Sequence, residues 1–215
     1  MSIYRDDTLE WITACADVLD ENSDYLTKLD AAIGDGDHGA NMDRGFKAVM
    51  LKIPDVADKD IGTILKTVGM TLISTVGGAA GPLYGTFFLQ AGMNLTGKME
   101  LNLEDWLLAL EAAVAGVVMR GKAELGDKTM VDALSPAVDS LKHSMDDHLS
   151  IDEALQLSAE AAKQGMVDTI PLVARKGRAS YLGERSAGHQ DPGATSSYQI
   201  LQAAADTWTD SKPIL

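Results

Sequence analysis

The sequence of 215 residues predicts an all-α fold. Apolar residues recur at helical spacing along most of the chain, and no run of about four to eight residues alternates between apolar and polar side chains as a half-buried strand does. Glycine is concentrated in four stretches, at a density that helices do not tolerate. These stretches are expected to form loops, over residues 34–39, 77–85, 121–129 and 177–193.

The clearest helical pattern lies between Leu103 and Val118. Its apolar residues fall on one face of a helix with about 3.6 residues per turn, and acidic residues take the opposite face. A similar pattern begins at Ile151, and weaker versions occur elsewhere. In chain order, the eight expected helices cover residues 7–27, 40–52, 59–75, 82–95, 103–118, 130–146, 151–166 and 194–209. No low-complexity linker or internal repeat divides the sequence, so we expect one domain over residues 1–215.

Two residue types are expected inside the helical body. Cys15, the single cysteine, lies among apolar neighbours with no basic residue beside it, which predicts a buried thiol rather than a nucleophile. Met70, Met93 and Met119 lie in apolar stretches. Because methionine fills irregular gaps in cores, these three are interpreted as core residues.

The formal net charge of -14 disfavours nucleic acids and anionic membrane surfaces as partners, because both carry negative charge. No run of about 18 uninterrupted apolar residues is present, so no membrane span is expected. The N-terminal residues contain no apolar targeting stretch. These observations together predict a cytoplasmic protein.

An aspartate-rich loop over residues 30–39 is the strongest functional signal. Asp30, Asp35 and Asp37 supply three carboxylates within eight residues, and the glycines among them let the backbone bring these groups together. Magnesium prefers oxygen ligands and commonly binds a few carboxylates together with substrate phosphates. The loop therefore predicts a site for two Mg²⁺ ions that share a phosphate chain. A solvated acidic turn is the alternative that the loop alone leaves open.

Other interpretations of glycine-rich segments fail. Residues 34–39 match the Gly-x-Gly-x-x-Gly pattern of dinucleotide-binding loops, but its two carboxylates would repel a pyrophosphate and no strand precedes it. An EF-hand needs a glutamate at its twelfth position, which is Asn41 when counted from Asp30. Near matches to the Walker A pattern at residues 92–99 and 116–123 lack the required Ser or Thr and follow helical patterns, so we interpret them as chance.

Two further loops are suited to phosphate. Residues 77–81 are small, so the backbone can approach a ligand closely, and Pro82 is placed to begin a helix whose free N–H groups would face an anion. A tight turn between helices is the alternative. The loop over residues 177–193 carries Arg178, Arg185 and His189. A guanidinium group matches the oxygens of a phosphate, and long polar loops of this kind are commonly functional.

Taken together, these motifs resemble a known family, the nucleotide-binding L subunit of dihydroxyacetone kinase. The resemblance extends over essentially the whole chain and rests on several separate motifs. They lie at residues 33–39, 77–83, 120–124, 126–130, 176–185 and 188–195. The resemblance implies a barrel of about eight antiparallel amphipathic helices, with the nucleotide site in the loops at one end.

The resemblance also assigns site residues. Asp30, Asp35 and Asp37 match the ligands of two Mg²⁺ ions. The positions that match contacts to ADP or ATP are His38, Asn41, Gly78, Ala79, Ala80, Gly121, Thr129, Met130, Arg178, Asp191, Pro192 and Gly193. Arg178 is the expected catalytic residue, since it would add positive charge at the reacting oxygens. Ala80 departs from the family, which commonly has serine there, so backbone N–H groups would replace a hydroxyl contact.

The activity implied by the resemblance is transfer of a phosphoryl group from Mg²⁺-bound nucleotide to dihydroxyacetone held on a partner K subunit. In the phosphoenolpyruvate-linked phosphotransferase branch, ADP stays bound and is rephosphorylated by a phosphocarrier M subunit. The free-standing length of 215 residues favours this branch. The alternatives are a subunit of a two-component ATP-dependent kinase for a related ketose such as erythrulose, and a nucleotide-bound regulatory module. A homodimer is left open.

Overall fold

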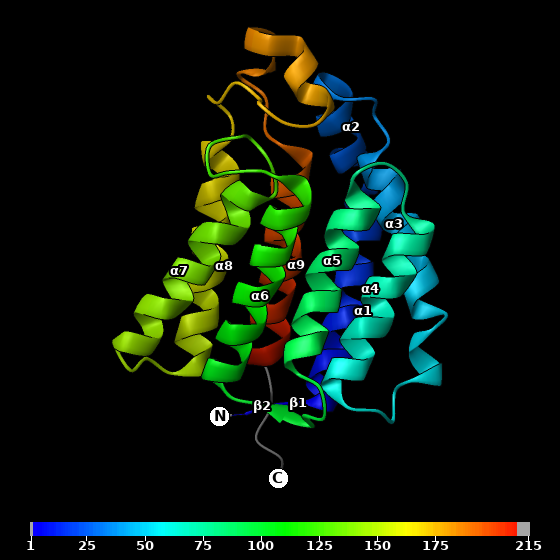
Figure 1. Cartoon of the computed structure of the whole chain (residues 1–215), viewed down its shortest axis with the longest axis vertical. Coiled ribbons are helices and arrows are strands. Elements are labelled where there is room, and N and C mark those ends of the chain that lie inside the picture. Colours follow the sequence, from blue (N-terminus) through cyan, green and yellow to red (C-terminus); the bar gives the residue numbers. More distant parts are fainter. Residues whose placement is uncertain (1, 210–215) are drawn as a thin grey trace.

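The computed structural model describes residues 2–209 and is mostly helical over that range (Figure 1). The prediction of an all-α fold is therefore confirmed. The helices are α1 (Arg5–Glu21), α2 (Ser23–Ile33), α3 (His38–Met50), α4 (Ile61–Thr75), α5 (Ala80–Asn94), α6 (Leu103–Gly121), α7 (Val131–Asp146), α8 (Ile151–Asp168) and α9 (Pro192–Thr209). The shorter elements are the 3₁₀ helices η1 (Ile53–Asp55) and η2 (Arg178–Ser186) and the strands β1 (Ile3–Tyr4) and β2 (Glu100–Leu101).

The helix predicted over residues 7–27 is in fact two helices, α1 and α2, which separate at Asn22. This residue leaves the helical conformation, with a φ of -100° and a ψ of 9°. Its side-chain Nδ2 donates to the carbonyl oxygen of Val18 at 2.8 Å, and its backbone N–H donates to the same oxygen at 3.1 Å. An asparagine side chain that competes for backbone carbonyls favours a helix end over a helix interior. Apolar spacing continues across the break, so spacing alone predicted one helix.

Most helices run along the long axis of the molecule (Figure 1). Each helix from α3 to α9 packs against the next one, and α9 packs back against α1, which also contacts α3. The loops that follow α2, α4, α6 and α8 lie toward one end, the upper end in Figure 1, and the paired strands β1 and β2 lie at the other. We call the upper end the rim, formed by residues 23–41, 77–83, 120–131 and 173–193.

The apolar core contains all three tryptophans of the chain. Trp11 of α1 lies 5.5 Å from Trp106 of α6 and 5.1 Å from Trp208 of α9, measured between ring centroids, and the rings meet edge to face. The indole N–H of Trp11 donates to the carbonyl of Ile200 at 2.9 Å. These contacts join the first, middle and last parts of the sequence. Cys15 is buried in the same core, as predicted, and burial raises the pKa of its thiol.

The α4 and α5 backbones are in direct contact. A Cβ atom built on Gly69 of α4 would lie 2.6 Å from the carbonyl oxygen of Gly85 in α5. A Cβ atom on Gly62 would lie 2.6 Å from the carbonyl oxygen of Gly92. Only hydrogen fits in these gaps, so the glycines set the spacing of the two helices. The glycine turn at residues 77–79 therefore connects two closely packed helices.

The prediction that Met70, Met93 and Met119 are core residues is wrong. Their exposed fractions are 65%, 56% and 79%. Each lies on the outward face of its helix, while leucine, valine and phenylalanine fill the inward positions. These helices carry apolar residues on more than one face, so composition did not distinguish the face that is buried.

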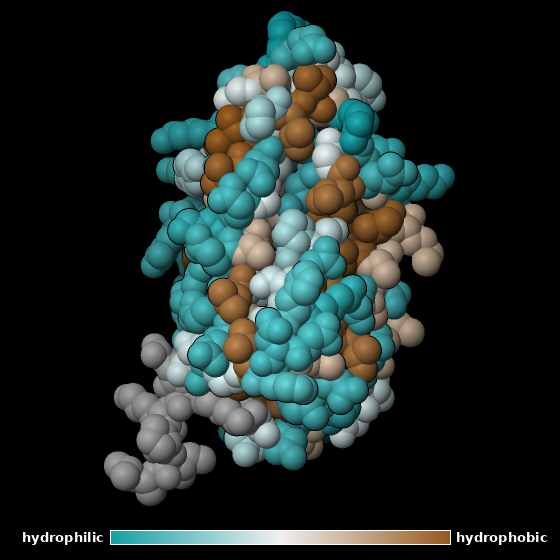
Figure 2. Space-filling model, turned by 90° about the vertical axis from the view of Figure 1, so that its left-hand side faces the viewer, coloured by the Kyte–Doolittle hydropathy of each residue, from teal (hydrophilic) through white to brown (hydrophobic). Residues whose placement is uncertain are grey.

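The face formed by α7 and α8 is covered mostly by hydrophilic side chains, and its hydrophobic side chains form separate patches (Figure 2). Such a surface agrees with the acidic composition of the chain. Among residues 2–209, none of the helices combines the length and the hydropathy that a membrane span requires.

Replacing Gly69 by alanine should lower the free energy of unfolding by about 1–3 kcal/mol, because the added methyl group would push α4 away from α5. The higher helix propensity of alanine, about 1 kcal/mol, acts in the opposite direction. Urea unfolding followed by circular dichroism measures the difference. Gly116→Ala in α6 is the matched control, because its Cβ would meet the movable side chain of Gln90 rather than a backbone. Equal losses in the two variants would contradict the close backbone contact.

Candidate functional site

A cavity of ≈ 1060 Å³ opens at the rim. Its volume is at the upper end of the range for small-molecule sites, about 300–1,000 Å³. Segments that are far apart in the sequence line it together. Every residue that the sequence analysis assigned to metal or nucleotide is in the lining: Asp30, Asp35, Asp37, His38, Asn41, Gly78, Ala79, Ala80, Gly121, Thr129, Met130, Arg178, Asp191, Pro192 and Gly193.

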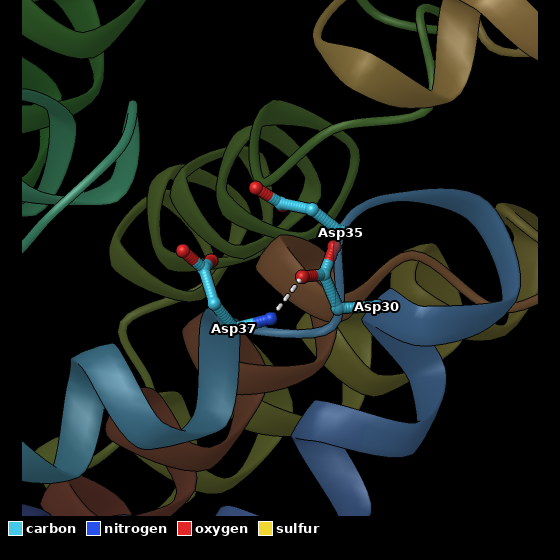
Figure 3. Close-up of side chains that lie close together, drawn as sticks. All are labelled: Asp30, Asp35 and Asp37. Carbon is cyan, nitrogen blue, oxygen red and sulfur yellow. Dashed lines mark hydrogen bonds between the residues drawn. The ribbon is translucent and has the colours of Figure 1, made fainter.

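Three carboxylates meet in this cavity. Asp30 lies in the last turn of α2, Asp35 in the loop that follows, and Asp37 at the start of α3. One oxygen from each lies within 4.8 Å of the others. Figure 3 shows the three side chains directed toward a shared space. The backbone N–H of Asp37 donates to Oδ2 of Asp30 at 2.8 Å, so Asp30 also holds the loop that carries the other two carboxylates.

Glycine is required at two positions of this loop. A Cβ atom on Gly34 would overlap Oδ1 of Asp30, and one on Gly39 would overlap the carbonyl oxygen of Ser23. The Asp30 carboxylate is held by the N–H of Asp37, and the Ser23 carbonyl belongs to the backbone of α2, so neither atom can move away freely. The two glycines therefore let the chain turn sharply between α2 and α3 while keeping the Asp30 carboxylate inside the turn.

The charges in this cluster are only partly balanced. Like charges at such short range repel one another, and the Nε atom of Arg178 lies 2.9 Å from Oδ2 of Asp35. One guanidinium cannot offset three carboxylates. The remaining negative charge and the oxygen-only donor set fit a hard divalent cation such as Mg²⁺, which takes carboxylates at a few positions and leaves others for phosphate oxygens.

The glycine turn places a helix N-terminus in the same cavity. Gly78 has a φ of +64°, and a Cβ atom on it would meet nothing within 4 Å, so the turn is open toward a ligand. Helix α5 begins at Ala80, and no side chain caps its first turn. Its N–H groups are thus available to an anion. The helix starts two residues earlier than predicted, since Pro82 occupies the third helical position, where a missing N–H is still tolerated.

A buried polar network joins the aspartate loop to α5 and α9. Nε2 of His38 lies 2.8 Å from Oγ of Ser196, and Oγ of Ser196 lies 2.6 Å from the Tyr84 hydroxyl. The Tyr84 hydroxyl also donates to the carbonyl of Gly193 at 2.9 Å. Burial lowers the pKa of His38, although Asp30 and Asp37 act to raise it. These hydrogen bonds fix α3, α5 and α9 relative to one another around the cavity.

Comparison with known proteins identifies the family of this chain. The DAK2 domain matches residues 32–206. The chain belongs to the DAK2 domain family. It is 51% identical to the PEP-dependent dihydroxyacetone kinase ADP-binding subunit DhaL of Escherichia coli, with 95% of this chain and 98% of the relative covered. It is 41% identical to the PTS-dependent dihydroxyacetone kinase ADP-binding subunit DhaL of Lactococcus lactis, with 92% and 94% covered.

A solved structure agrees with this assignment. The dihydroxyacetone kinase from C. freundii in complex with AMP-PNP and Mg²⁺ superposes with a TM-score of 0.70 at 28% identity, over 91% of this chain and 33% of that chain. The resemblance that the motifs predicted, including that to the phosphotransferase-linked branch, is confirmed.

Several residues of the DAK2 cavity were given no role by the sequence analysis. They are Tyr84, Arg120, Lys128, Arg175 and Lys176. Arg120, Lys128 and Lys176 lie within motifs of the family resemblance, whereas Tyr84 and Arg175 lie outside them, and only the fold brings the five side chains together. Conversely, Arg185 and His189 were grouped with Arg178 as phosphate candidates and lie outside the cavity lining.

Asp191 caps the helix that closes the cavity. Its Oδ2 accepts the N–H of Ala194 at 2.7 Å, in the first turn of α9. Burial raises the pKa of Asp191 to about 7, against the lowering effect of the Ala194 N–H, and the nearby Asp132 carboxylate adds to the rise. The ionised form of Asp191 therefore opposes the folded state.

Without metal and nucleotide, the contribution of Asp191 to the stability of the DAK2 chain should fall as pH rises between about 4 and 7. The pKa of Asp191 is about 7 in the folded state against 3.8 as its ordinary value, so the folded state holds the proton more tightly. The stabilisation by the proton on Asp191 is fully present below a pH of 3.8 and is lost above a pH of about 7. Asp191→Asn keeps an acceptor for the Ala194 N–H without the charge.

Urea unfolding of both proteins at about pH 5 and about pH 8 measures the effect. The variant should lose less stability over this interval, by about 2–3 kcal/mol at most. Parallel losses in the two proteins would show that Asp191 ionises freely in the folded state.

Proposed function

We propose that this DAK2 chain is the ADP-binding subunit of a dihydroxyacetone kinase, and that a phosphoryl group passes from its Mg²⁺-bound nucleotide to dihydroxyacetone on a partner K subunit. The observation that carries the proposal is the composition of one cavity, in which the carboxylate cluster and the uncapped start of α5 occur together. The printed names of the E. coli and L. lactis relatives support the same activity.

Asp30, Asp35 and Asp37 would hold two Mg²⁺ ions. When bound, the ions would neutralise charge on the phosphates and on the transferred group. The chain itself contributes the pre-formed arrangement, because the Asp30 carboxylate is already fixed by the N–H of Asp37 at 2.8 Å. The C. freundii kinase, crystallised with AMP-PNP and Mg²⁺, supports this combination of ligands.

The remaining walls suit the other parts of a nucleotide. The N–H groups at residues 78–81 would donate to phosphate oxygens without help from a side chain at Ala80. Leu83, Val117 and Met130 form an apolar part of the lining that would contact the base. The division of the lining into a charged part and an apolar part supports a nucleotide over a free phosphate.

Arg178 is the proposed catalytic residue. Its side chain is 68% exposed and pairs with Asp35 at 2.9 Å, so it lies beside the carboxylates and is still reachable from outside. A guanidinium there would bind the terminal phosphate and offset the charge that develops during transfer. An accessible position also suits a reaction in which the acceptor is presented by another subunit.

ADP is the proposed resident cofactor, recharged in place by a phosphocarrier M subunit as the PTS-dependent name of the L. lactis relative suggests. Purified protein can be denatured and its released nucleotide identified. Stoichiometric ADP that resists exchange with labelled ATP is the expected result. Free and reversible ATP binding to an empty site would instead favour direct use of ATP.

We also propose that α1 and α3 to α9 form the closed helical barrel implied by the family resemblance. The packing of each helix on its neighbour, and of α9 on α1, supports a closed ring. The cavity would then occupy one open end of the barrel, where loops rather than helix faces meet the ligand.

Asp37→Asn should reduce co-purified ADP at least about tenfold, because one of three metal-ligating carboxylates is lost. The free energy of unfolding of the ligand-free protein should stay equal or rise, since the change relieves repulsion within the cluster. Nucleotide content by absorbance and chromatography, together with urea unfolding, measures both. Asp24→Asn, on the exposed side of α2, is the matched control and should keep its ADP. Full ADP content and kinase activity in Asp37→Asn would disprove the metal assignment.

A further inference from the structure

Lys128 is a buried lysine at the rim. Only 1% of its surface is exposed, although its side chain carries an ammonium group. Its Nζ donates to the carbonyl oxygens of Thr169 at 2.7 Å and Leu172 at 3.2 Å, and also to that of His189. A fourth carbonyl, that of Ile170, lies 3.4 Å away. Backbone carbonyls thus replace the water that a lysine normally keeps, which satisfies the charge inside the protein.

These carbonyls belong to the two ends of one loop. Residues 169–172 directly follow α8, and His189 lies two residues before Asp191. The segment between them, residues 173–188, contains η2 and therefore Arg178. Lys128 is the side chain whose ammonium bonds to both ends at once. We call residues 173–188 the arginine loop.

Neighbouring contacts support the same junction. The N–H of Gly188 donates to the carbonyl of Ile170 at 2.7 Å, and Nε of Arg175 lies 2.6 Å from Oδ1 of Asp127. The N–H of Ala174 donates to Oγ of Ser186 at 2.8 Å. All of these contacts lie at the base of the arginine loop. Its exposed part, which carries Arg178, depends on this base for its position over the cavity.

Removal of the ammonium would leave the carbonyl oxygens of Leu172 and His189 without a donor among the described residues. The carbonyl of Ile170 would keep the N–H of Gly188, and that of Thr169 would keep the N–H of Leu172. The dipoles of the clustered carbonyls repel, and the two unpaired oxygens would need water. The base of the arginine loop would then open, and Arg178, Asp191 and Gly193 would shift relative to the aspartate cluster. Burial lowers the pKa of Lys128, while Asp191 and Asp132 act to raise it, so both carboxylates favour the charged form.

We infer that Lys128 is a positioning residue that fastens the base of the arginine loop and thereby sets how long nucleotide stays in the rim cavity. This inference rests on the proposed function for its effect on nucleotide. Its effect on the loop stands on the hydrogen bonds alone. No direct contact between Lys128 and the ligand is required.

The test compares wild-type protein with Lys128→Met, which keeps the length of the side chain without its charge. Protein loaded with radiolabelled ADP and Mg²⁺ is diluted into unlabelled ADP, and the release rate is measured. Hydrogen exchange of peptides covering residues 169–192 is measured in parallel. Lys142→Met, on an exposed surface of α7, is the control for loss of one positive charge.

Lys128→Met should release ADP at least about tenfold faster than wild type and Lys142→Met. A change of this size agrees with the loss of hydrogen bonds to a charged group. Amides of residues 169–192 should exchange faster, while those of α4 and α5 keep their wild-type rates. A merely structural lysine would speed exchange throughout the helical body. Release as slow as that of Lys142→Met, or exchange faster in every helix, would overturn the inference.

Lys128→Ala adds a rescue experiment. The atoms removed correspond to n-propylammonium, and the vacated space borders the cavity. Incubation with n-propylammonium before loading should slow ADP release in a saturable way, whereas sodium chloride at the same concentration should not. Absence of rescue would show that the ammonium group is not the cause. Failure of all Lys128 variants to fold, with Lys142→Met folded, would make the lysine a determinant of the whole fold and overturn the local role.

The two proposals fail in different ways. Wild-type protein that retains no ADP would count against the proposed function, whatever Lys128 does. In that case hydrogen exchange still decides whether Lys128 fastens the arginine loop, because that measurement needs no nucleotide.

Discussion

Repulsion among three carboxylates is the constraint on which the rim depends. Asp30, Asp35 and Asp37 present oxygens within 4.8 Å of one another, an arrangement that an unfolded chain would avoid. The fold maintains it through glycines that permit the turn, through an N–H bond from Asp37 to Asp30, and through one arginine of η2. Negative charge is left over, and this excess would favour a divalent cation at the proposed metal site.

The helical body supports this unfavourable cluster from several sides. Buried hydroxyls at Tyr84 and Ser196 connect it to α5 and α9, and the backbone contact between α4 and α5 fixes the turn that faces it. A buried ammonium at Lys128 holds the loop above it. The buried hydroxyls and the ammonium have hydrogen-bond partners, so the cost of their burial is offset by hydrogen bonds rather than added to the repulsion.

Much of this site could be predicted from the sequence because its donors lie close together along the chain. The aspartates fall within one loop, and the small residues at 77–81 fall within another, so local chemistry suggested the roles that are now proposed for them. The helical periodicity likewise predicted the fold class. It did not predict the break at Asn22, which depends on one side chain competing for a carbonyl. Lys128 lies in the motif at residues 126–130, but its role could not be predicted, because its acceptors are backbone carbonyls more than 40 residues away. Met119 was misplaced because α6 is apolar on more than one face.

The backbone contact between α4 and α5 also affects the order in which the chain assembles. Its two helices are adjacent in sequence and are joined by a short turn, so little chain entropy is lost when they pair. The glycine turn should therefore form early. The aspartate loop reaches α9 through His38 and Ser196, which are 158 residues apart, and this contact requires nearly the entire chain. A chain still emerging from the ribosome would thus acquire the turn proposed to face phosphate long before the proposed nucleotide site is complete.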